Sequence, residues 1–372
     1  MLTDRLARGA VPTPSLVLDA EALDRNITLM AERAGRVGVA LRPHVKSHKC
    51  LAIARRLAQA GAVGACCATI DEAEALAAGG IEGLLITSPM STAALIERVR
   101  RLRPHSADLM LVVDHAQTVE RLAALPQGGC GPLRLIVELD VGVGRTGCLD
   151  CRSVVALAQQ IAGLPQLRFA GIQAYWGNLQ QVMPFAERER RVHLQAERLR
   201  GLIADLTAAG LPPGIVSGGG TGTHAIDGVL GLYTELQPGS FMFLDSCYGA
   251  IPLAADGNPF EPSLFVAASV VSANTPGRSI VNAGFKAFAT DSGLPKVSRG
   301  APLQSTYRYM GDEHGAVDCP DGTAPKVGDT VEFLTSHCDP TVNLHAQYHV
   351  VRGDEVVDVW PIIARGYGDP EP

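Results

Sequence analysis

Long apolar segments are absent from this 372-residue sequence, and none of its hydrophobic runs approaches the roughly 20 residues that a membrane-spanning helix requires. An excess of basic residues is also absent, because 32 lysines and arginines face 38 aspartates and glutamates and leave a formal charge of −6. The basic residues are dispersed among acidic ones, so we expect neither nucleic acid nor a membrane as a partner. Residues 1–8 carry charges of both signs and no apolar core, so we expect no secretory signal.

Paired metal-binding cysteine motifs are lacking as well. The nine cysteines are odd in number, most lie within apolar segments, and they form no set of paired Cys-x-x-Cys motifs of the kind that holds zinc. Reduced thiols in a cytoplasmic protein are the simplest interpretation. The sequence also contains no solenoid repeat and no low-complexity segment. With 47% hydrophobic residues, it is long and apolar enough for a large core and more than one domain.

Eight strand-like runs alternate with helical stretches through most of the sequence. The runs are mainly continuous rather than alternating in hydrophobicity, as expected for parallel strands buried on both faces. The stretches between them are amphipathic, and Asp71, Ser91 and Asp150 are good helix N-cap residues. An α/β fold with a (β/α)8 TIM barrel over residues 20–262 accounts for this pattern, and a doubly wound open sheet is the alternative. The runs are 39–45, 63–69, 83–88, 108–114, 133–140, 169–175, 214–220 and 235–243, and the clearest helices are 71–79, 91–102, 150–163 and 184–209.

The pattern changes after residue 262. Short strands separated by Gly, Pro and Asp clusters are expected at 266–272, 279–281, 330–334, 348–351 and 356–360, without a convincing helix among them. This indicates a C-terminal antiparallel β domain over residues 263–372. The segment 13–19 is a further expected strand before the first barrel helix at 20–34, and we assign residues 1–19 to the β domain.

Lys46 lies in a basic segment, Arg42–Lys49, directly after the apolar residues 39–41. A lysine that closes the first barrel strand projects into the mouth of the barrel, where active sites form. There its amine can form a Schiff base with a carbonyl substrate or with pyridoxal phosphate. Taken alone, the segment favours a solvated surface turn, because basic and polar residues dominate it.

Two glycine-containing turns follow the seventh and eighth expected strands. In Ser217–Thr223, three successive glycines allow backbone N–H groups to approach an anion, and Thr221 adds a hydroxyl donor. Gly239 and Ser240 occupy the corresponding place after the eighth strand. Phosphate sites in barrels usually lie after these two strands. A single glycine-rich turn is weak evidence, but two such turns together with a lysine after the first strand favour a phosphate-bearing cofactor.

His337 and Asp339 follow the expected strand 330–334. Residues two apart on an extended chain point to the same side, so one imidazole and one carboxylate can share an ion. This mixture suits Mn²⁺, Zn²⁺ or Mg²⁺, with water or substrate completing the coordination. A structural zinc site is not expected, because no second pair of ligands has matching spacing. By itself, a His-x-Asp sequence usually belongs to a polar loop.

Taken together, these segments resemble the fold type III pyridoxal-phosphate enzymes, an alanine racemase-like group that includes D-threonine aldolase, 3-hydroxy-D-aspartate aldolase and eukaryotic-type D-serine dehydratase. The resemblance implies that Lys46 is the catalytic residue that carries pyridoxal 5'-phosphate. It also implies that His337 and Asp339 bind a divalent metal, with Mn²⁺ preferred over Mg²⁺ or Zn²⁺, and that the chain forms a homodimer acting on a small amino acid. The blocks that carry the resemblance are 13–19, 41–49, 138–147, 171–177, 217–222, 233–240, 312–315 and 336–343.

The resemblance also implies further site residues. The positions that match cofactor contacts are Thr221, Gly239, Ser240 and Tyr248, and Tyr175, Gly220 and Gly222 are expected beside them. Arg145 is expected either to hold a cofactor or substrate oxygen or to be a surface arginine. Gln173 and Trp176 are expected on the substrate side.

Asp339 favours one activity within the group. The aldolases tend to carry His-x-Asp and the dehydratases His-x-Cys. We therefore expect a lyase that cleaves the Cα–Cβ bond of β-hydroxy-D-amino acids to glycine and an aldehyde. The alternatives are a D-serine or 3-hydroxyaspartate dehydratase, which releases ammonia and an oxoacid, and an amino-acid racemase or a non-catalytic carrier of the cofactor.

The sequence departs from the pattern of the group at three positions. Trp176 stands where the threonine aldolases have a histidine and the hydroxyaspartate aldolase a glutamine, Gln181 replaces a histidine, and Ala68 replaces a glutamine near the cofactor. A tryptophan beside the metal would favour a bulkier or more apolar β-substituent than that of threonine. The other interpretation is that Trp176 is a packing residue turned away from the site.

Overall fold

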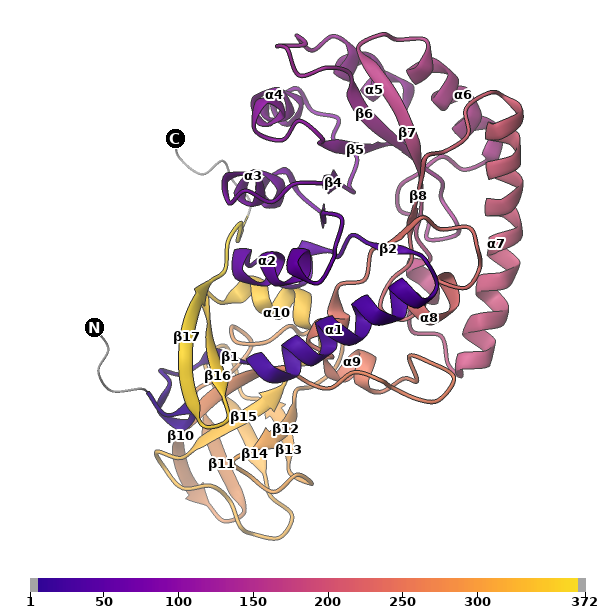
Figure 1. The fold of residues 1–372 in the computed structure, drawn as a ribbon. Helices are drawn as coiled ribbons and strands as arrows, with labels where there is room; N and C mark the ends of the chain where they lie inside the picture. The colour runs from indigo at the N-terminus through magenta and orange to yellow at the C-terminus, as the bar shows by residue number, and fades with distance from the viewer. Residues whose placement is uncertain (1–5, 367–372) are drawn as a thin grey trace.

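The computed structural model describes residues 6–366, which form two sheets (Figure 1). Eight parallel strands make one sheet in the order β2-β9-β8-β7-β6-β5-β4-β3, and helices follow most of these strands. This arrangement confirms the predicted (β/α)8 barrel. The strands are β2 (Ala40–Leu41), β3 (Ala65–Cys67), β4 (Leu84–Ile86), β5 (Met110–Val113), β6 (Leu133–Glu138), β7 (Leu167–Ala174), β8 (Ile215–Gly218) and β9 (Glu235–Leu236).

Hydrogen bonds between the two end strands of this order close the barrel. The N–H of Val63 donates to the carbonyl of Leu41 at 2.8 Å, and the N–H of Cys66 donates to the carbonyl of Pro43 at 2.9 Å. These bonds join β2 to the start of β3, so no open edge remains between the first and last strands. The open-sheet alternative is therefore wrong.

A buried ion pair stabilises the interior of the barrel where it closes. The guanidinium of Arg42, directly after β2, donates two hydrogen bonds to the carboxylate of Glu235 on β9, at 2.9 and 2.8 Å. The hydroxyl of Ser217 on β8 donates to the same carboxylate at 2.6 Å. Arg42 and Glu235 are 5% and 3% exposed. Because both charges are removed from water, each depends on the other for its stability.

Several helices outside the barrel begin after a capping side chain, although two of these caps differ from those predicted. Asp150 caps α6 as predicted, whereas Thr69 and Thr92, not Asp71 and Ser91, cap α3 and α4. Each threonine hydroxyl accepts a hydrogen bond from an N–H of the first turn. The barrel helices are α1 (Ala20–Arg36), α2 (Leu51–Gln59), α3 (Ile70–Ala78), α4 (Ala93–Leu102), α5 (Ala116–Ala123), α6 (Cys151–Ala162) and α7 (Phe185–Ala208), with short α8 (His224–Asp227) and α9 (Ser246–Gly249).

The second sheet is antiparallel in every pair but one, which confirms the expected antiparallel β domain. β1 (Ser15–Asp19) pairs antiparallel with β10 (Leu264–Thr275) and parallel with β16 (Gln347–Arg352), so the N-terminal strand belongs to this sheet. The remaining pairs are antiparallel. They involve β11 (Arg278–Val281), β12 (Lys296–Arg299), β13 (Thr306–Tyr309), β14 (Gly315–Asp318), β15 (Thr330–Leu334) and β17 (Glu355–Pro361).

The sequence analysis did not predict four elements of this region. Strands β12, β13 and β14 are four residues each and largely polar or small, so they lack the apolar runs by which strands are recognised. Helix α10 (Cys338–Leu344) follows β15, although no helix was expected here. A seven-residue helix spans about two turns, which is too short for a periodic pattern to stand out.

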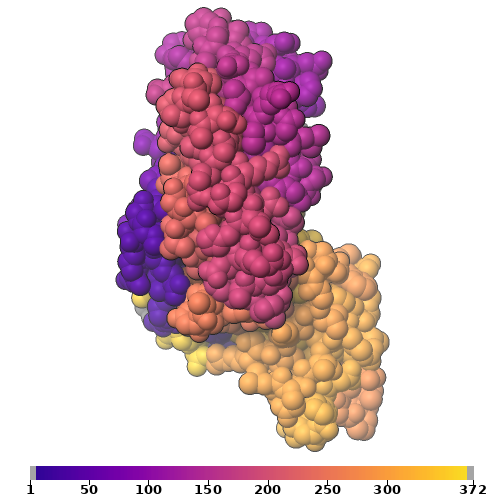
Figure 2. All heavy atoms as spheres, turned by 90° about the vertical axis from the view of Figure 1, so that its right-hand side faces the viewer, coloured from indigo at the N-terminus to yellow at the C-terminus, as the bar shows by residue number. Residues whose placement is uncertain are grey.

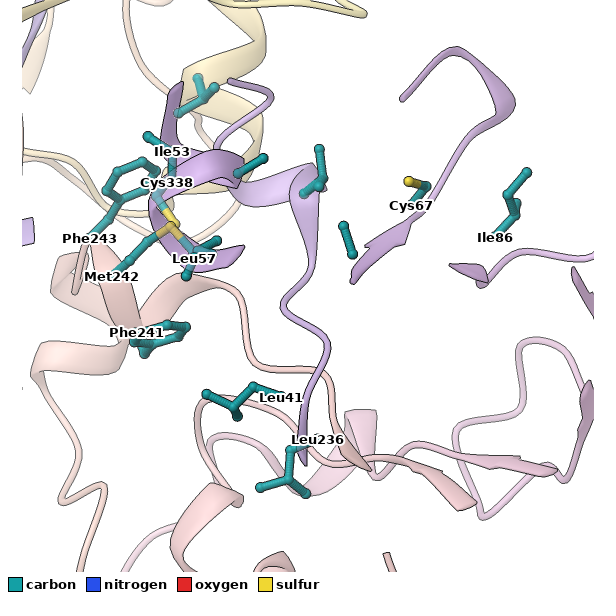
Figure 3. Packing of buried hydrophobic residues seen from close by; sticks show 14 of the residues in the cluster. Leu41, Ile53, Leu57, Cys67, Ile86, Leu236, Phe241, Met242, Phe243 and Cys338 are labelled. Carbon is teal, nitrogen blue, oxygen red and sulfur yellow. The ribbon is translucent and has the colours of Figure 1, made fainter. Parts of the chain in front are cut away.

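The two lobes share one apolar core. Figure 2 shows the barrel and the β domain as adjoining lobes, and Figure 3 shows buried residues of both around the turn that follows β9. Phe241 and Phe243 come from this turn and Cys338 from α10, and all three are fully buried in the cluster that also contains Leu41 of the barrel. Burial of these side chains holds α10 against the mouth of the barrel.

The structure also bears on membrane-spanning segments and on the state of the cysteines. Within residues 6–366, no helix combines the length and the apolar character needed to cross a membrane. All nine cysteines are unpaired. The one Cys-x-x-Cys spacing, Cys148 and Cys151, does not form a joint site, since the two thiols donate to different carbonyls, those of Asp114 and Arg198.

Candidate active site

A cavity of about 160 Å³ opens at the carboxyl ends of the barrel strands, where active sites of barrel enzymes form. It is lined by His44, Lys46, Ala68, Thr87, Ser88, Arg145, Gln173, Tyr175, Gly220, Thr221, Gln237, Gly239, Ser240, Tyr248 and Asp339. A larger cavity of about 360 Å³ lies at the amino ends of β3 and β4, beside α2, and none of the predicted site residues lines it. The convergence of titratable groups and glycine turns identifies the smaller cavity as the candidate site.

Lys46 and Lys49 have different environments, although they lie in one basic segment. Lys46 belongs to a short 3-10 turn, η2 (Val45–Ser47), and its side chain is 47% exposed at the cavity. Lys49 is buried, and its ammonium donates to Glu72 at 2.8 Å and to the carbonyl of Ala364 at 2.9 Å. Lys49 is therefore occupied in a structural contact, and Lys46 is the lysine of this segment that a small molecule can reach.

Lys46 meets Asp339 across the boundary between the two lobes. The Nζ of Lys46 lies 2.5 Å from Oδ2 of Asp339. The nearby carboxylate raises the pKa of the Lys46 amine above its ordinary value. Burial opposes ionisation of Asp339, but the ammonium holds the pKa of this carboxyl below its usual range. The pair brings together the amine predicted to carry a cofactor and a predicted metal ligand.

The two predicted anion-binding turns lie side by side. Gly220 and Thr221 follow β8, and Gly239 and Ser240 follow β9; all four line the cavity. The N–H of Phe241 donates to Oγ1 of Thr221 at 3.1 Å, which ties the turns together. Because Thr221 accepts this bond, its hydroxyl hydrogen is left to donate elsewhere. Gly222, which was expected at the cofactor, does not line the cavity, and its N–H donates instead to Oε1 of Gln180 at 2.9 Å.

Gln173 belongs to the floor of the cavity rather than to an open substrate surface. It lies on β7, and its Nε2 donates to Glu138 at 3.0 Å and to the carbonyl of Thr87 at 3.2 Å. Its Oε1 accepts from Gln237 at 3.1 Å. Burial raises the pKa of Glu138. With every polar atom of the amide engaged, Gln173 fixes neighbouring side chains and presents little free hydrogen-bonding capacity.

Tyr175 and Tyr248 form part of the wall of the cavity. Tyr175 is two residues after Gln173, so the two side chains project to the same face of the extended chain. Tyr248 is held by α9, whose N-cap carboxylate, Asp245, accepts from the N–H of Tyr248 at 3.0 Å. Burial raises the pKa of both phenols. Both hydroxyls therefore stay protonated at neutral pH and are available as donors.

The loop after β6 brings Arg145 to the cavity. Asp140 shapes this loop, because its carboxylate accepts from the N–H groups of Gly142 and Val143, each at 2.9 Å, and from that of Gly144. Gly144 has a φ of +68°, a conformation that favours glycine. Arg145 is exposed and lines the cavity. Of the two expectations for this residue, its position favours contact with a bound oxyanion.

His337 and Asp339 lie on a helix start and not on an extended strand, which corrects the geometry expected from the sequence. His337 is the N-cap residue of α10, and Asp339 lies in its first turn. Nδ1 of His337 lies 2.6 Å from Oδ2 of Asp291, while Asp339 is paired with Lys46. Among residues 6–366, no three His, Cys, Asp or Glu side chains are grouped as a metal site. Asp339 lines the cavity, and His337 stands two residues before it at the start of the same helix, outside the cavity lining.

Trp176 is turned away from the cavity, which corrects the expectation that it contacts the substrate. Its side chain is fully buried and packs edge-on against Tyr233, and its indole N–H donates to Oδ1 of Asp227 at 3.0 Å. Of the two interpretations of Trp176, its position agrees with that of a packing residue. Gln181 is exposed, and its Nε2 lies 2.9 Å from Sγ of Cys247. Ala68 lines the cavity as its position suggested.

Several residues around the site were not found from the sequence. Thr87, Ser88 and His44 line the cavity, and burial lowers the pKa of His44 to about 3, so this imidazole is neutral. The sequence could have indicated all three residues, because they lie at the ends of expected barrel strands, where barrel active sites form. For Asp291, no motif signals the contact with His337, because the two residues approach only through tertiary packing.

The chain is similar to known proteins along nearly its whole length. Residues 18–247 match the sequence model of the alanine racemase N-terminal domain, and residues 263–351 match that of a serine dehydratase domain. The 3-hydroxy-D-aspartate aldolase of Paracoccus denitrificans (strain Pd 1222) is 39% identical over 363 residues, which cover 96% of this chain and 93% of that protein. The D-threonine aldolase of an Arthrobacter species is 41% identical over 376 residues, covering 98% and 95%.

A solved structure is similar in both lobes. The crystal structure of D-threonine aldolase from Filomicrobium marinum superimposes with a TM-score of 0.93 and 35% sequence identity, over 97% of this chain and 98% of that one. The order of a barrel followed by a β domain is thus shared along the full length.

Proposed function

Since this chain belongs to the alanine racemase N-terminal domain family, in the group that contains the D-threonine and 3-hydroxy-D-aspartate aldolases, we propose that it is an aldehyde-lyase of the D-threonine aldolase type. The proposed reaction cleaves the Cα–Cβ bond of a β-hydroxy-D-amino acid to glycine and an aldehyde. The observation that carries the proposal is the 2.5 Å contact between Lys46 and Asp339 in a cavity that also holds two glycine turns. This combination supports the proposal, because an amine, a carboxylate and two glycine turns that suit an anion line the same cavity.

The residues of the cavity fit pyridoxal 5'-phosphate. Thr221 and Ser240, with the glycine beside each, offer the hydroxyl and backbone donors that a phosphate requires. Lys46 offers the amine that bonds to the cofactor carbonyl. When bound, pyridoxal phosphate supplies an electron sink for the electron pair of the broken bond. Arg145 and Tyr175 would complete the surroundings of the cofactor as hydrogen-bond donors.

The donors at the cavity edge also fit a hard or borderline divalent ion, for which we propose Mn²⁺. His337 would supply a borderline nitrogen ligand and Asp339 a hard oxygen ligand, and Mg²⁺ and Zn²⁺ are the alternatives for the same pair. When bound, the ion supplies a Lewis acid that lowers the pKa of the substrate β-hydroxyl. Asp291 would hold the Nδ1 side of His337, which leaves Nε2 as its ligand atom.

The chain's own residues divide the remaining tasks. The Asp339 carboxylate, 2.5 Å away, keeps the Lys46 amine protonated, so the amine can act as a nucleophile only after the ion pair has separated and the amine has lost this proton to solvent. On the floor of the cavity, both ends of the Gln173 amide are hydrogen-bonded, and Gln237 donates to Gln173 and to Ser217, so these donors are already engaged within the chain. Tyr175 and Tyr248 remain neutral donors on the walls.

We also propose a homodimer, which follows from the family resemblance. Light scattering of the purified chain at two concentrations would measure the mass directly. A monomer at both concentrations would contradict this part of the proposal.

The test of the function is a product assay with pyridoxal phosphate and Mn²⁺. Purified protein is given a panel of β-hydroxy-D-amino acids, including D-threonine and 3-hydroxy-D-aspartate, and glycine and ammonia are measured separately. Glycine with an aldehyde is the expected result. Ammonia with an oxoacid would instead assign a dehydratase, and the absence of both products would leave a racemase or a cofactor carrier.

Two matched variants separate the roles of the cofactor and the metal. Lys46→Ala should abolish both cleavage and the visible absorbance band of lysine-bound cofactor, because the amine is lost. Asp339→Ala should keep that band but lose cleavage, because the metal ligand is removed while the amine of Lys46 remains. Turnover that persists after chelation of divalent ions would contradict the role of the metal.

A further inference from the structure

A hydrogen-bonded network lies directly behind residues 219–223 after β8. This is the first of the two predicted anion-binding turns, and we call it the phosphate-type turn. Asp227, at the end of α8, accepts from the indole N–H of Trp176 at 3.0 Å and from the hydroxyl of Thr223. Thr223 belongs to the turn itself, and its Oγ1 accepts from the N–H of Gly220, which lines the cavity, at 3.3 Å. The chain of contacts therefore runs from Trp176, through a buried carboxylate, to the backbone of the turn.

A second branch of the network holds the same turn through Gln180. Its Nε2 donates to the carbonyl of Trp176 at 3.1 Å and to Oγ1 of Thr223 at 3.0 Å, and its Oε1 accepts from the N–H of Gly222. With these bonds, Thr223 donates once and accepts twice, and the amide of Gln180 uses both hydrogens and its oxygen. The hydroxyl has no hydrogen-bonding capacity left and the amide has no free hydrogen, so loss of one partner leaves another group of the network without its hydrogen bond.

The turn also lies too close to this network for side chains of its own. A Cβ on Gly219 would lie 2.9 Å from Oδ2 of Asp227, and a Cβ on Gly220 would overlap Oε1 of Gln180. Gly219 in addition has a φ of +69°. Gly219 and Gly220 thus serve a second purpose besides approach to an anion, because they let the turn rest on Asp227 and Gln180. The position of the turn is set by what lies behind it.

Asp227 depends on its two donors because it is fully buried and its contacts are uncharged. Its exposure is 0%, and the indole and the hydroxyl that contact it carry no charge. A buried carboxylate without a cation is costly, and each donor offsets part of that cost. Removing the indole N–H would leave Asp227 with Thr223 as its remaining donor, and the turn would follow any rearrangement.

We propose that Trp176 and Asp227 are positioning residues for the phosphate-binding turn, and that they act on the cofactor phosphate without touching it. This inference rests on the proposed function, because it requires a phosphate-bearing cofactor at Gly220 and Thr221. It also gives a role to Trp176 that its place in the sequence did not suggest. Trp176 controls the affinity for the phosphate and not the choice of the β-substituent.

The test compares pyridoxal phosphate with pyridoxal, which lacks the phosphate. The full-length protein is stripped of cofactor and titrated with each aldehyde, and binding is followed by visible absorbance. Trp176→Phe removes the N–H and retains an aromatic ring. It should weaken pyridoxal phosphate binding about tenfold, the size expected for the loss of one hydrogen bond, and leave pyridoxal binding unchanged. Trp360→Phe, whose indole contacts Asp358 on β17, is the matched control and should change neither.

A second variant tests the coupling and remains informative if Trp176→Phe fails to fold. Asp227→Asn keeps the size of the side chain but replaces one acceptor oxygen by an amide, so it should show the same selective loss for the phosphate form. In the Asp227→Asn background, Trp176→Phe should add less than its effect alone. Equal weakening for both aldehydes, or no weakening for either, would overturn the inference. Failure of the unaltered protein to bind pyridoxal phosphate would instead overturn the proposed function, and the inference with it.

Discussion

Replacement of Asp227 by Asn should change how the stability of the protein depends on pH. Burial raises the pKa of Asp227 to about 7, against an ordinary value of 3.8, and the hydrogen bonds from Thr223 and Trp176 lower it only in part. Between these two values, the folded protein binds a proton that the unfolded chain has released. The contribution of Asp227 to the free energy of unfolding is therefore fully present below about pH 4 and is lost as the pH rises through about 7.

The size of this effect follows from the same two values. The difference between these two pKa values corresponds to a change of ~4 kcal/mol in the free energy of unfolding over the whole pH range. Between pH 5 and pH 8, where the protein is convenient to study, the expected change is about 2.5 kcal/mol. Asn does not titrate, so the difference in unfolding free energy between the unaltered protein and Asp227→Asn isolates this one group.

The assay is urea unfolding of both proteins without cofactor at several pH values, followed by circular dichroism. The unaltered protein should lose stability relative to Asp227→Asn as the pH rises from 5 to 8. Asp150→Asn is the control, because Asp150 is an exposed helix cap whose pKa lies below its usual value, and its difference should stay flat over this range. A flat difference for Asp227→Asn would refute the reasoning, since it would mean that the two donors outweigh burial.

Two further predictions concern stability. Glu235→Ala should lower the free energy of unfolding by about 3–5 kcal/mol, because it leaves the buried charge of Arg42 unpaired, and urea unfolding measures this directly; a loss below about 1 kcal/mol would contradict the importance of the pair. Tyr348→Phe should cost about 1 kcal/mol, because the phenol of Tyr348 donates to the carbonyl of His48 at 2.6 Å between the β domain and the barrel. A thermal melt would register it as a small drop in Tm, and an unchanged Tm would contradict the contribution of this bond.

Much of the barrel was predictable because its signals are local. Continuous apolar runs predicted all eight strands, and the stretches between them predicted the helices, because burial of each element leaves its periodicity in neighbouring residues. Strands β12, β13 and β14 were missed since a four-residue polar strand is stabilised by its neighbours in the sheet and not by its own composition. Helix α10 was not predicted either, because its seven residues are too few for a periodic pattern and its start packs against the barrel turn.

The candidate site shows where this local information ends. Lys46, the glycine turns after β8 and β9, and the His337–Asp339 pair were recognisable by residue type and by their places after strands. Their relations were not recognisable, because Lys46 and Asp339 are 293 positions apart and meet only when the β domain packs on the barrel. The helical backbone at Asp339 likewise replaced the extended geometry expected from spacing alone.

Trp176 marks the division most clearly. The sequence by itself determined the order of strands and helices, the barrel class and the kinds of chemical groups near the site, because these depend on residue type and short-range spacing. The tertiary structure alone decided that the indole of Trp176 points behind the phosphate-type turn to Asp227 and not into the cavity. The direction of a side chain after the end of a strand depends on which buried partner can accept its hydrogen bond, and that partner lies 51 positions away.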